Sequence, residues 1–124
     1  MAQPVVHFEI IGRDPGGLRN YYGNLFGWKF DTSNPVVEEV SVADDYGFVD
    51  PKGDGIPGGV GGGPGYSPQT VFYVGVPNVE EALQAAERLG GTRRMGPSRR
   101  PDGGLVVGNF TDPEGNLIGV AGPA

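Results

Sequence analysis

The sequence predicts an α+β protein in which two βαβββ modules make up one domain over residues 1–124. A strand, a capped amphipathic helix and a glycine stop occur twice, so that His7 falls on Val71 and Gly27 on Gly91. Three further strand-like segments follow each of these helices. The modules are expected at about residues 1–63 and about residues 69–124.

The first module opens with an alternating strand over residues 4–12. Its two faces carry Val6, Phe8 and Ile10 on one side, and His7, Glu9 and Ile11 on the other. Asp14 is expected as the N-cap of a helix, with Pro15 at the first helical position and Gly27 as its stop. The apolar stripe of this helix comprises Leu18, Tyr22, Leu25 and Phe26.

Short strands are expected after this helix, separated by turn residues. They are Trp28–Asp31, Val36–Ala43 and Tyr46–Val49, with the glycine-rich segment Ile56–Gly62 as a candidate fourth strand.

The second module repeats the pattern with a stronger helix signal. A strand is expected over residues 71–76, and Asn78 with Glu81 forms a capping-box pattern. The helix stripe contains Val79, Ala82, Leu83, Ala86 and Leu89, and we expect Leu83 and Leu89 to be buried. The remaining strands are expected at Thr92–Met95, Leu105–Phe110 and Leu117–Ala121.

Composition excludes several classes of partner. The chain has no cysteine, so it can form neither a disulfide nor a thiolate metal site. Its formal net charge of −6 argues against nucleic acid and anionic membranes as partners. There is no apolar run of membrane-spanning length, and the N-terminal MAQPVVHF does not resemble a signal peptide, so we expect a cytoplasmic protein.

Three segments resemble the glyoxalase/bleomycin-resistance/dioxygenase superfamily, also called the vicinal-oxygen-chelate fold. They are YYGNLFGW at 21–28, the second strand–helix unit at 71–91, and FTDPEGNLI at 110–118. The resemblance implies a mixed sheet curled into a cup with the helices outside. It also implies a homodimer, and a small-molecule ligand held in the sheet cleft.

The resemblance further implies a metal site with ligands on the first and last strands of each half. His7 matches the first ligand position, but Val71 and Gly119 stand at two others, and the remaining position falls within Gly59–Gly61. Valine and glycine side chains cannot coordinate a metal, and a bound ion needs three or more donors. We therefore expect neither a metal nor another cofactor.

His7 and Glu9 are the candidate catalytic residues, since alternation places both on the cup-facing side of the first strand. An imidazole and a carboxylate there could transfer protons. The alternatives are a structural histidine and a solvated carboxylate.

Aromatic and amide side chains are the candidate ligand-binding residues: Tyr73, Tyr46, Phe48, Asn109 and Phe110. Each ring could equally be a packing residue, as we expect for Trp28. Alternation allows only one of Asn109 and Phe110 to face the cup.

A basic run of Arg93, Arg94, Arg99 and Arg100 is interpreted as a solvated face, with anion binding as the alternative.

Three functions compete. We predict a metal-independent protein that binds a small organic molecule, like the superfamily's antibiotic-sequestering members. The first alternative is a metal-independent isomerase, cyclase or lyase that uses His7 and Glu9. The second is a metal-dependent lyase or dioxygenase, which the missing ligands disfavour.

Overall fold

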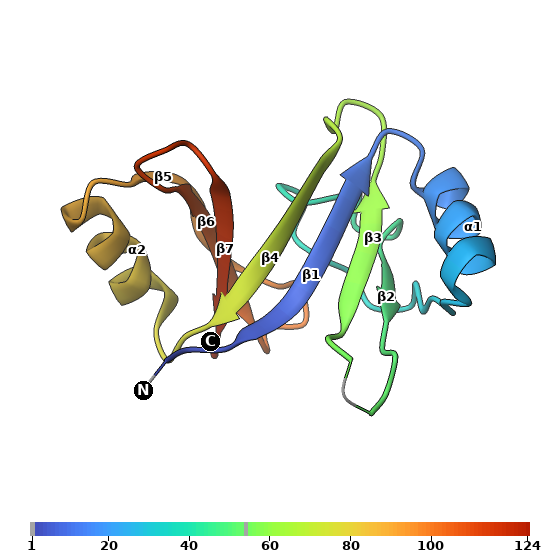
Figure 1. Cartoon of the computed structure of the whole chain (residues 1–124), viewed down its shortest axis with the longest axis horizontal. Coiled ribbons are helices and arrows are strands. Elements are labelled where there is room, and N and C mark those ends of the chain that lie inside the picture. The colour runs from blue at the N-terminus through green and yellow to red at the C-terminus, as the bar shows by residue number, and fades with distance from the viewer. Residues whose placement is uncertain (1, 54) are drawn as a thin grey trace. The chain divides into compact units, whose positions relative to one another are not determined.

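The computed structural model describes residues 2–53 and 55–124, and within them it contains two helices and seven strands (Figure 1). In chain order these are β1 (Val5–Gly12), α1 (Pro15–Phe26), β2 (Gly47–Val49), β3 (Gly58–Gly62), β4 (Gln69–Gly75), α2 (Val79–Arg88), β5 (Thr92–Arg99), β6 (Val106–Thr111) and β7 (Leu117–Gly122). The predicted α+β class is confirmed. The chain forms two compact units, one of residues 7–70 and one of residues 71–124 with the N-terminal residues up to Val6.

The unit of residues 7–70 is built on strands in the order β2-β3-β1, with α1 packed on β3 (Figure 1). β1 runs parallel to β3, and Glu9 lies opposite Gly59. β2 runs antiparallel to β3 and places Phe48 on the other side of Gly59. Glu9, Gly59 and Phe48 therefore form one row across these three strands.

Helix α1 begins and ends as the sequence predicts. The Asp14 side chain accepts a hydrogen bond from the Gly17 backbone at 3.1 Å, and Gly27 ends the helix in the left-handed region at φ 73°. The predicted stripe is wrong at Leu25 and Phe26, which are 55% and 57% exposed.

Arg19 takes part of the buried face of α1 instead. Its guanidinium donates to the backbone oxygens of Asp45 and Val60 and pairs with the Asp45 carboxylate at 2.7 Å. The long cationic side chain of Arg19 therefore connects α1 to Asp45 and to β3 through hydrogen bonds, whereas the predicted stripe implied apolar contacts.

The predicted strand at Val36–Ala43 is wrong. Val36, Val37 and Val40 are buried, but the backbone turns there, and the Val37 carbonyl accepts from the amides of Val40 and Ser41. Val36 and Val37 are adjacent, and Val40 follows three residues later. This spacing lacks the period of two that a half-buried strand requires.

The predicted strand at Trp28–Asp31 is reduced to one bridge between Asp31 and Phe48. Among its described residues, the unit of residues 7–70 therefore has two strands between its helix and β4, at 47–49 and 58–62, rather than the expected three or four.

The unit of residues 71–124 follows the predicted βαβββ order, with strands arranged as β4-β7-β6-β5 and α2 packed on β5, β6 and β7 (Figure 1). The Asn78 side chain caps α2 by accepting from the Glu81 amide at 2.9 Å. The core beneath the helix contains Val76, Val79, Leu83 and Val120. Leu83 is fully buried as predicted, whereas Leu89 is 82% exposed because the helix ends at Arg88.

Neither helix in the described part of the chain is long and apolar enough to span a membrane.

Arg93 on β5 connects this strand to α2 through a bidentate ion pair with Glu80. Its Nη1 and Nη2 atoms donate to Glu80 Oε1 and Oε2 at 2.9 and 2.7 Å, and Glu87 accepts a further bond at 3.1 Å. The hydrogen bonds from Arg93, then the bond from Gln84, lower the pKa of Glu80 to about 2.

We predict that Glu80 titrates at about pH 2 and that Arg93→Gln returns its pKa toward 4.5. The folded-state pKa lies below the unfolded value, so the pair stabilises the fold above about pH 4.5, and this contribution is lost as the pH falls toward 2. Side-chain carboxyl NMR measures the titration. Arg94→Gln removes the same charge one residue away and should leave Glu80 unchanged. An unshifted Glu80 in Arg93→Gln would contradict the assignment.

Candidate functional site

The site is centred on three polar side chains in the unit of residues 7–70. His7 and Glu9 project from the same face of β1, and Tyr46 comes from the loop immediately before β2. Glu9 and Tyr46 are buried, at 3% and 1% exposure, while His7 is half-buried. A charged side chain and a hydroxyl buried to this degree require hydrogen-bond partners.

The Tyr46 hydroxyl joins the other two groups. It donates to Glu9 Oε1 at 3.0 Å, and the same oxygen lies 2.8 Å from His7 Nε2. A tyrosine hydroxyl has one proton, so with that proton directed at Glu9 the oxygen must accept from His7. This fixes the His7 tautomer with a proton on Nε2. A positive charge on the imidazole would be stabilised through Tyr46 by the Glu9 carboxylate.

Glycines in β3 make room for the Tyr46 ring. A Cβ atom built on Gly59 would lie 2.0 Å from Tyr46 Cε1, and one on Gly61 would lie 2.6 Å from Tyr46 Cδ2. Any side chain at Gly59 would therefore displace the ring that connects His7 with Glu9. The glycine-rich sequence of β3 has a packing role in this site.

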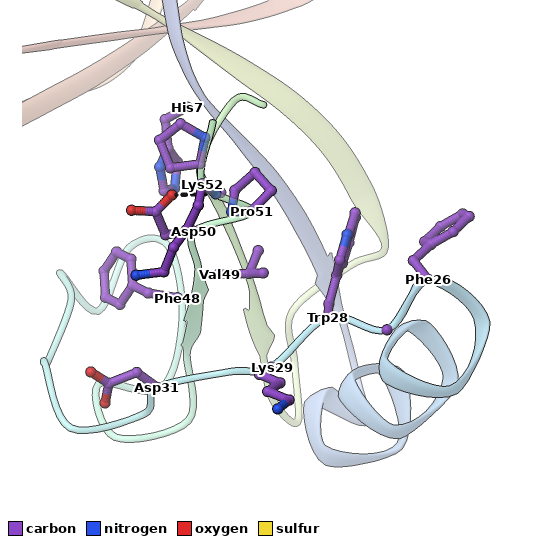
Figure 2. Close-up of a pocket in the computed structure, with 13 residues that line it drawn as sticks. His7, Phe26, Trp28, Lys29, Asp31, Phe48, Val49, Asp50, Pro51 and Lys52 are labelled. Carbon is purple, nitrogen blue, oxygen red and sulfur yellow. Dashed lines mark hydrogen bonds between the residues drawn. The ribbon is translucent and has the colours of Figure 1, made fainter. Parts of the chain in front are cut away.

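A groove of about 760 Å³ lies beside these residues and includes His7 in its lining (Figure 2). Its apolar walls are formed by Phe26, Trp28, Phe48, Val49, Pro51 and Pro57. The Phe48 ring centre lies 6.0 Å from that of His7. The size and the aromatic walls are those of a site for a small organic molecule.

Trp28 packs as well as lines the groove. Its ring is surrounded by those of Phe8, Tyr22 and Phe26, with centres 5.1–5.8 Å away. This agrees with the packing role expected from the sequence.

Four charged side chains also line the groove: Lys29, Asp31, Asp50 and Lys52. Hydrogen bonds from the Ser33 hydroxyl, then from its backbone amide, hold the pKa of Asp31 below its usual range. Asp50 accepts a bond from the Lys52 backbone amide at 3.0 Å. Sequence reasoning did not identify these residues, because no motif marks them and only the folding of two loops gathers them.

The other candidate ligand-binding residues belong to the unit of residues 71–124. Phe110 packs against the core beneath α2, so Asn109 faces the opposite side of the strands. Asn109, Gly119 and Tyr73 form a row across β6, β7 and β4 on that opposite side. Asn109 and Tyr73 are buried, and Asn109 Oδ1 has no hydrogen-bond partner among the described residues.

The residues present do not fit the metal that the superfamily resemblance implies. Gly59 and Gly119 have no donor, and a Cβ on Gly119 would lie 2.5 Å from Tyr73 Cδ2, so each position is covered by a tyrosine ring. Val71 is buried and apolar. Within residues 2–53 and 55–124, no three His, Cys, Asp or Glu side chains gather as a metal site would require.

The basic run is divided among separate intramolecular contacts. Arg93 is held by Glu80 and Glu87, Arg100 pairs with Asp102, and Arg99 donates to the Gly103 carbonyl. Arg94 is exposed and has no such bond within the described part of the chain, so the solvated-face interpretation fits Arg94 alone.

The chain belongs to the Glyoxalase/Bleomycin resistance protein/Dioxygenase superfamily, whose family model matches residues 5–120. No curated protein sequence matches the chain.

Solved structures with the same fold include enzymes of different names. Methylmalonyl-CoA epimerase of Streptomyces coelicolor, in complex with 2-nitronate-propionyl-CoA, has a TM-score of 0.69 at 15% identity and covers 100% of this chain and 96% of its own. The methylmalonyl-CoA epimerase of Mycobacterium tuberculosis has a TM-score of 0.63 at 14% identity, and the match covers 97% of this chain and 87% of the epimerase chain. An NAD-dependent benzaldehyde dehydrogenase from Legionella pneumophila has a TM-score of 0.61 at 14% identity, and the match covers 95% of this chain and 98% of the other chain. At these identities the likeness establishes the fold and not the reaction.

Proposed function

We propose that the protein binds a small, flat organic molecule in the groove beside β2 and β3, without a metal ion. One observation carries the proposal: an aromatic groove of about 760 Å³ includes an imidazole whose orientation is fixed through Tyr46 by a buried carboxylate. Aromatic walls with a few oriented polar groups are typical of small-molecule sites. Homodimer formation, which the sequence also predicts, stays a prediction.

A ligand screen with matched variants tests the proposal. A compound present at about a hundred times its dissociation constant should stabilise the protein by about 2.7 kcal/mol in thermal melts. Phe48→Leu removes an aromatic wall of the groove and should weaken that stabilisation. Phe72→Leu makes the same change at a side chain that is 41% exposed and outside the groove, and it should have no effect. A compound that stabilises the Phe48→Leu and Phe72→Leu variants equally would bind outside this groove.

Metal independence is tested on the same protein. We expect no stoichiometric zinc, nickel, manganese or iron after dialysis, and ligand binding that survives chelation. One metal ion per chain that disappears in His7→Ala would overturn this part of the proposal.

The hydrogen-bonded chain from His7 to Glu9 favours a second candidate, a metal-independent isomerase, cyclase or lyase. In it, His7 would take a proton from the bound molecule, and Glu9 would stabilise the resulting imidazolium through Tyr46. The solved structures of this fold include methylmalonyl-CoA epimerases, which are isomerases. Solvent deuterium appearing in a bound hit, and its loss in His7→Gln, would distinguish catalysis from binding alone.

A further inference from the structure

The turn between β2 and β3 holds a lysine in a backbone conformation that favours glycine. Lys52 has φ 65°, and no other non-glycine residue in the described part of the chain has a positive φ. A side chain in the left-handed region carries a steric cost, which asparagine and glycine largely avoid. Such residues cluster where ligands are held, so an unfavourable conformation at a groove residue suggests a use for that side chain.

The charges around the groove point to what that use is. Lys29 and Lys52 are the two lysines of the chain, and both line this groove. Neither ammonium group has an ion-pair partner in residues 2–53 and 55–124. By contrast, Asp31 and Asp50 each accept hydrogen bonds from their own loops. The ammonium groups of the groove are therefore without an ion-pair partner among these residues, while its two carboxylates, which keep their charge, are held toward their own loops by hydrogen bonds.

Only one of the two lysines is directed along the groove. In Figure 2 the Lys52 side chain extends toward Phe48, whereas the end of the Lys29 side chain points away from the other labelled residues. A molecule lying against the Phe48 ring would thus meet the Lys52 ammonium at its edge.

We propose that the ligand of this groove is an organic acid and that Lys52 determines this specificity by pairing with its carboxylate. The proposal rests on the groove being the ligand site. The flat part of the acid lies against Phe48, and its carboxylate lies at the turn of Asp50–Gly53.

A pair of isosteric probes tests the inference: 1-naphthoate and its neutral counterpart 1-naphthamide. Binding is followed by NMR through the indole N–H of Trp28, the single tryptophan of the chain, which lines the groove. The native protein should prefer the acid by about three- to fivefold, as expected for an exposed ion pair. Added salt should weaken this preference.

Variants at both lysines separate the outcomes. Lys52→Asn suits the left-handed conformation and should abolish the preference while leaving stability equal or higher; Lys52→Arg should retain the preference. Lys29→Gln removes the same charge from the groove and should leave the preference intact. Equal binding of acid and amide by the native protein would overturn the role of Lys52 and leave the groove as the ligand site. If neither probe shifts the Trp28 indole N–H signal, both the role of Lys52 and the groove as the ligand site would be overturned.

Discussion

Replacing Leu83 with alanine should lower the free energy of unfolding by about 2–5 kcal/mol. Leu83 is fully buried between α2 and the strands and packs with Val76, Val79 and Val120. Its Cδ1 atom would lie only 2.9 Å from a Cβ built on Gly108, so the side chain fills the space that this glycine leaves. Truncation removes apolar contacts and leaves a cavity that packed strands cannot close.

The chain offers a matched control for this experiment in Leu89→Ala. Leu89 lies six positions further along the same predicted stripe but is 82% exposed, so its truncation should change stability by less than about 0.5 kcal/mol. Denaturant melts of both variants measure the difference. A loss below about 1 kcal/mol for Leu83→Ala would show that α2 does not pack on the strands through this residue.

The unit of residues 71–124 was largely predictable because its signals are local. The Asn78 cap, the stripe through Leu83 and the turn chemistry of residues 112–115 each act over a few residues. The structure confirms the helix and all four strands, although β5 runs four residues beyond the expected Thr92–Met95, to Arg99. Leu89 was misassigned because a periodic stripe does not say where the last turn ends.

The segment from Gly27 to Tyr46 could not be predicted in the same way. Its valines are buried as their hydrophobicity requires, but burial does not specify a strand. The backbone there is set by side-chain contacts from elsewhere, such as the bonds from Arg19 to Asp45. Such contacts join residues far apart in sequence and leave no periodic signal.

The candidate site was predictable in part. Alternation along β1 placed His7 and Glu9 on one face, and both side chains do contact the Tyr46 hydroxyl. The bridging position of Tyr46 was not foreseen, because it depends on a loop folding over Gly59 and Gly61. The glycines of β3 were a usable signal, since a glycine inside a strand often marks a close approach by another group.

Tyr46→Phe should destabilise the protein by about 1–3 kcal/mol, because it removes a hydrogen bond from a buried carboxylate. The ring that covers Gly59 and Gly61 is retained, so the change deletes only the hydroxyl that donates to Glu9 and accepts from His7. The imidazole should also lose its fixed tautomer. Nitrogen chemical shifts of His7 should show the proton on Nε2 in the native protein and a mixture in the variant.

Tyr66→Phe is the control for this last experiment, since the Tyr66 hydroxyl donates to the Glu38 carbonyl near the surface. A hydroxyl lost where water can replace it should cost less than about 1 kcal/mol and leave His7 unchanged. Equal destabilisation of the two variants would mean that the bond to Glu9 is worth no more than a surface contact. A native His7 with its proton on Nδ1 would contradict the direction of the chain from His7 through Tyr46 to Glu9. Nε2 of neutral His7 would then accept from the Tyr46 hydroxyl, neither ring nitrogen would be free to take a proton from a ligand, and the proton-transfer candidate would lose its support.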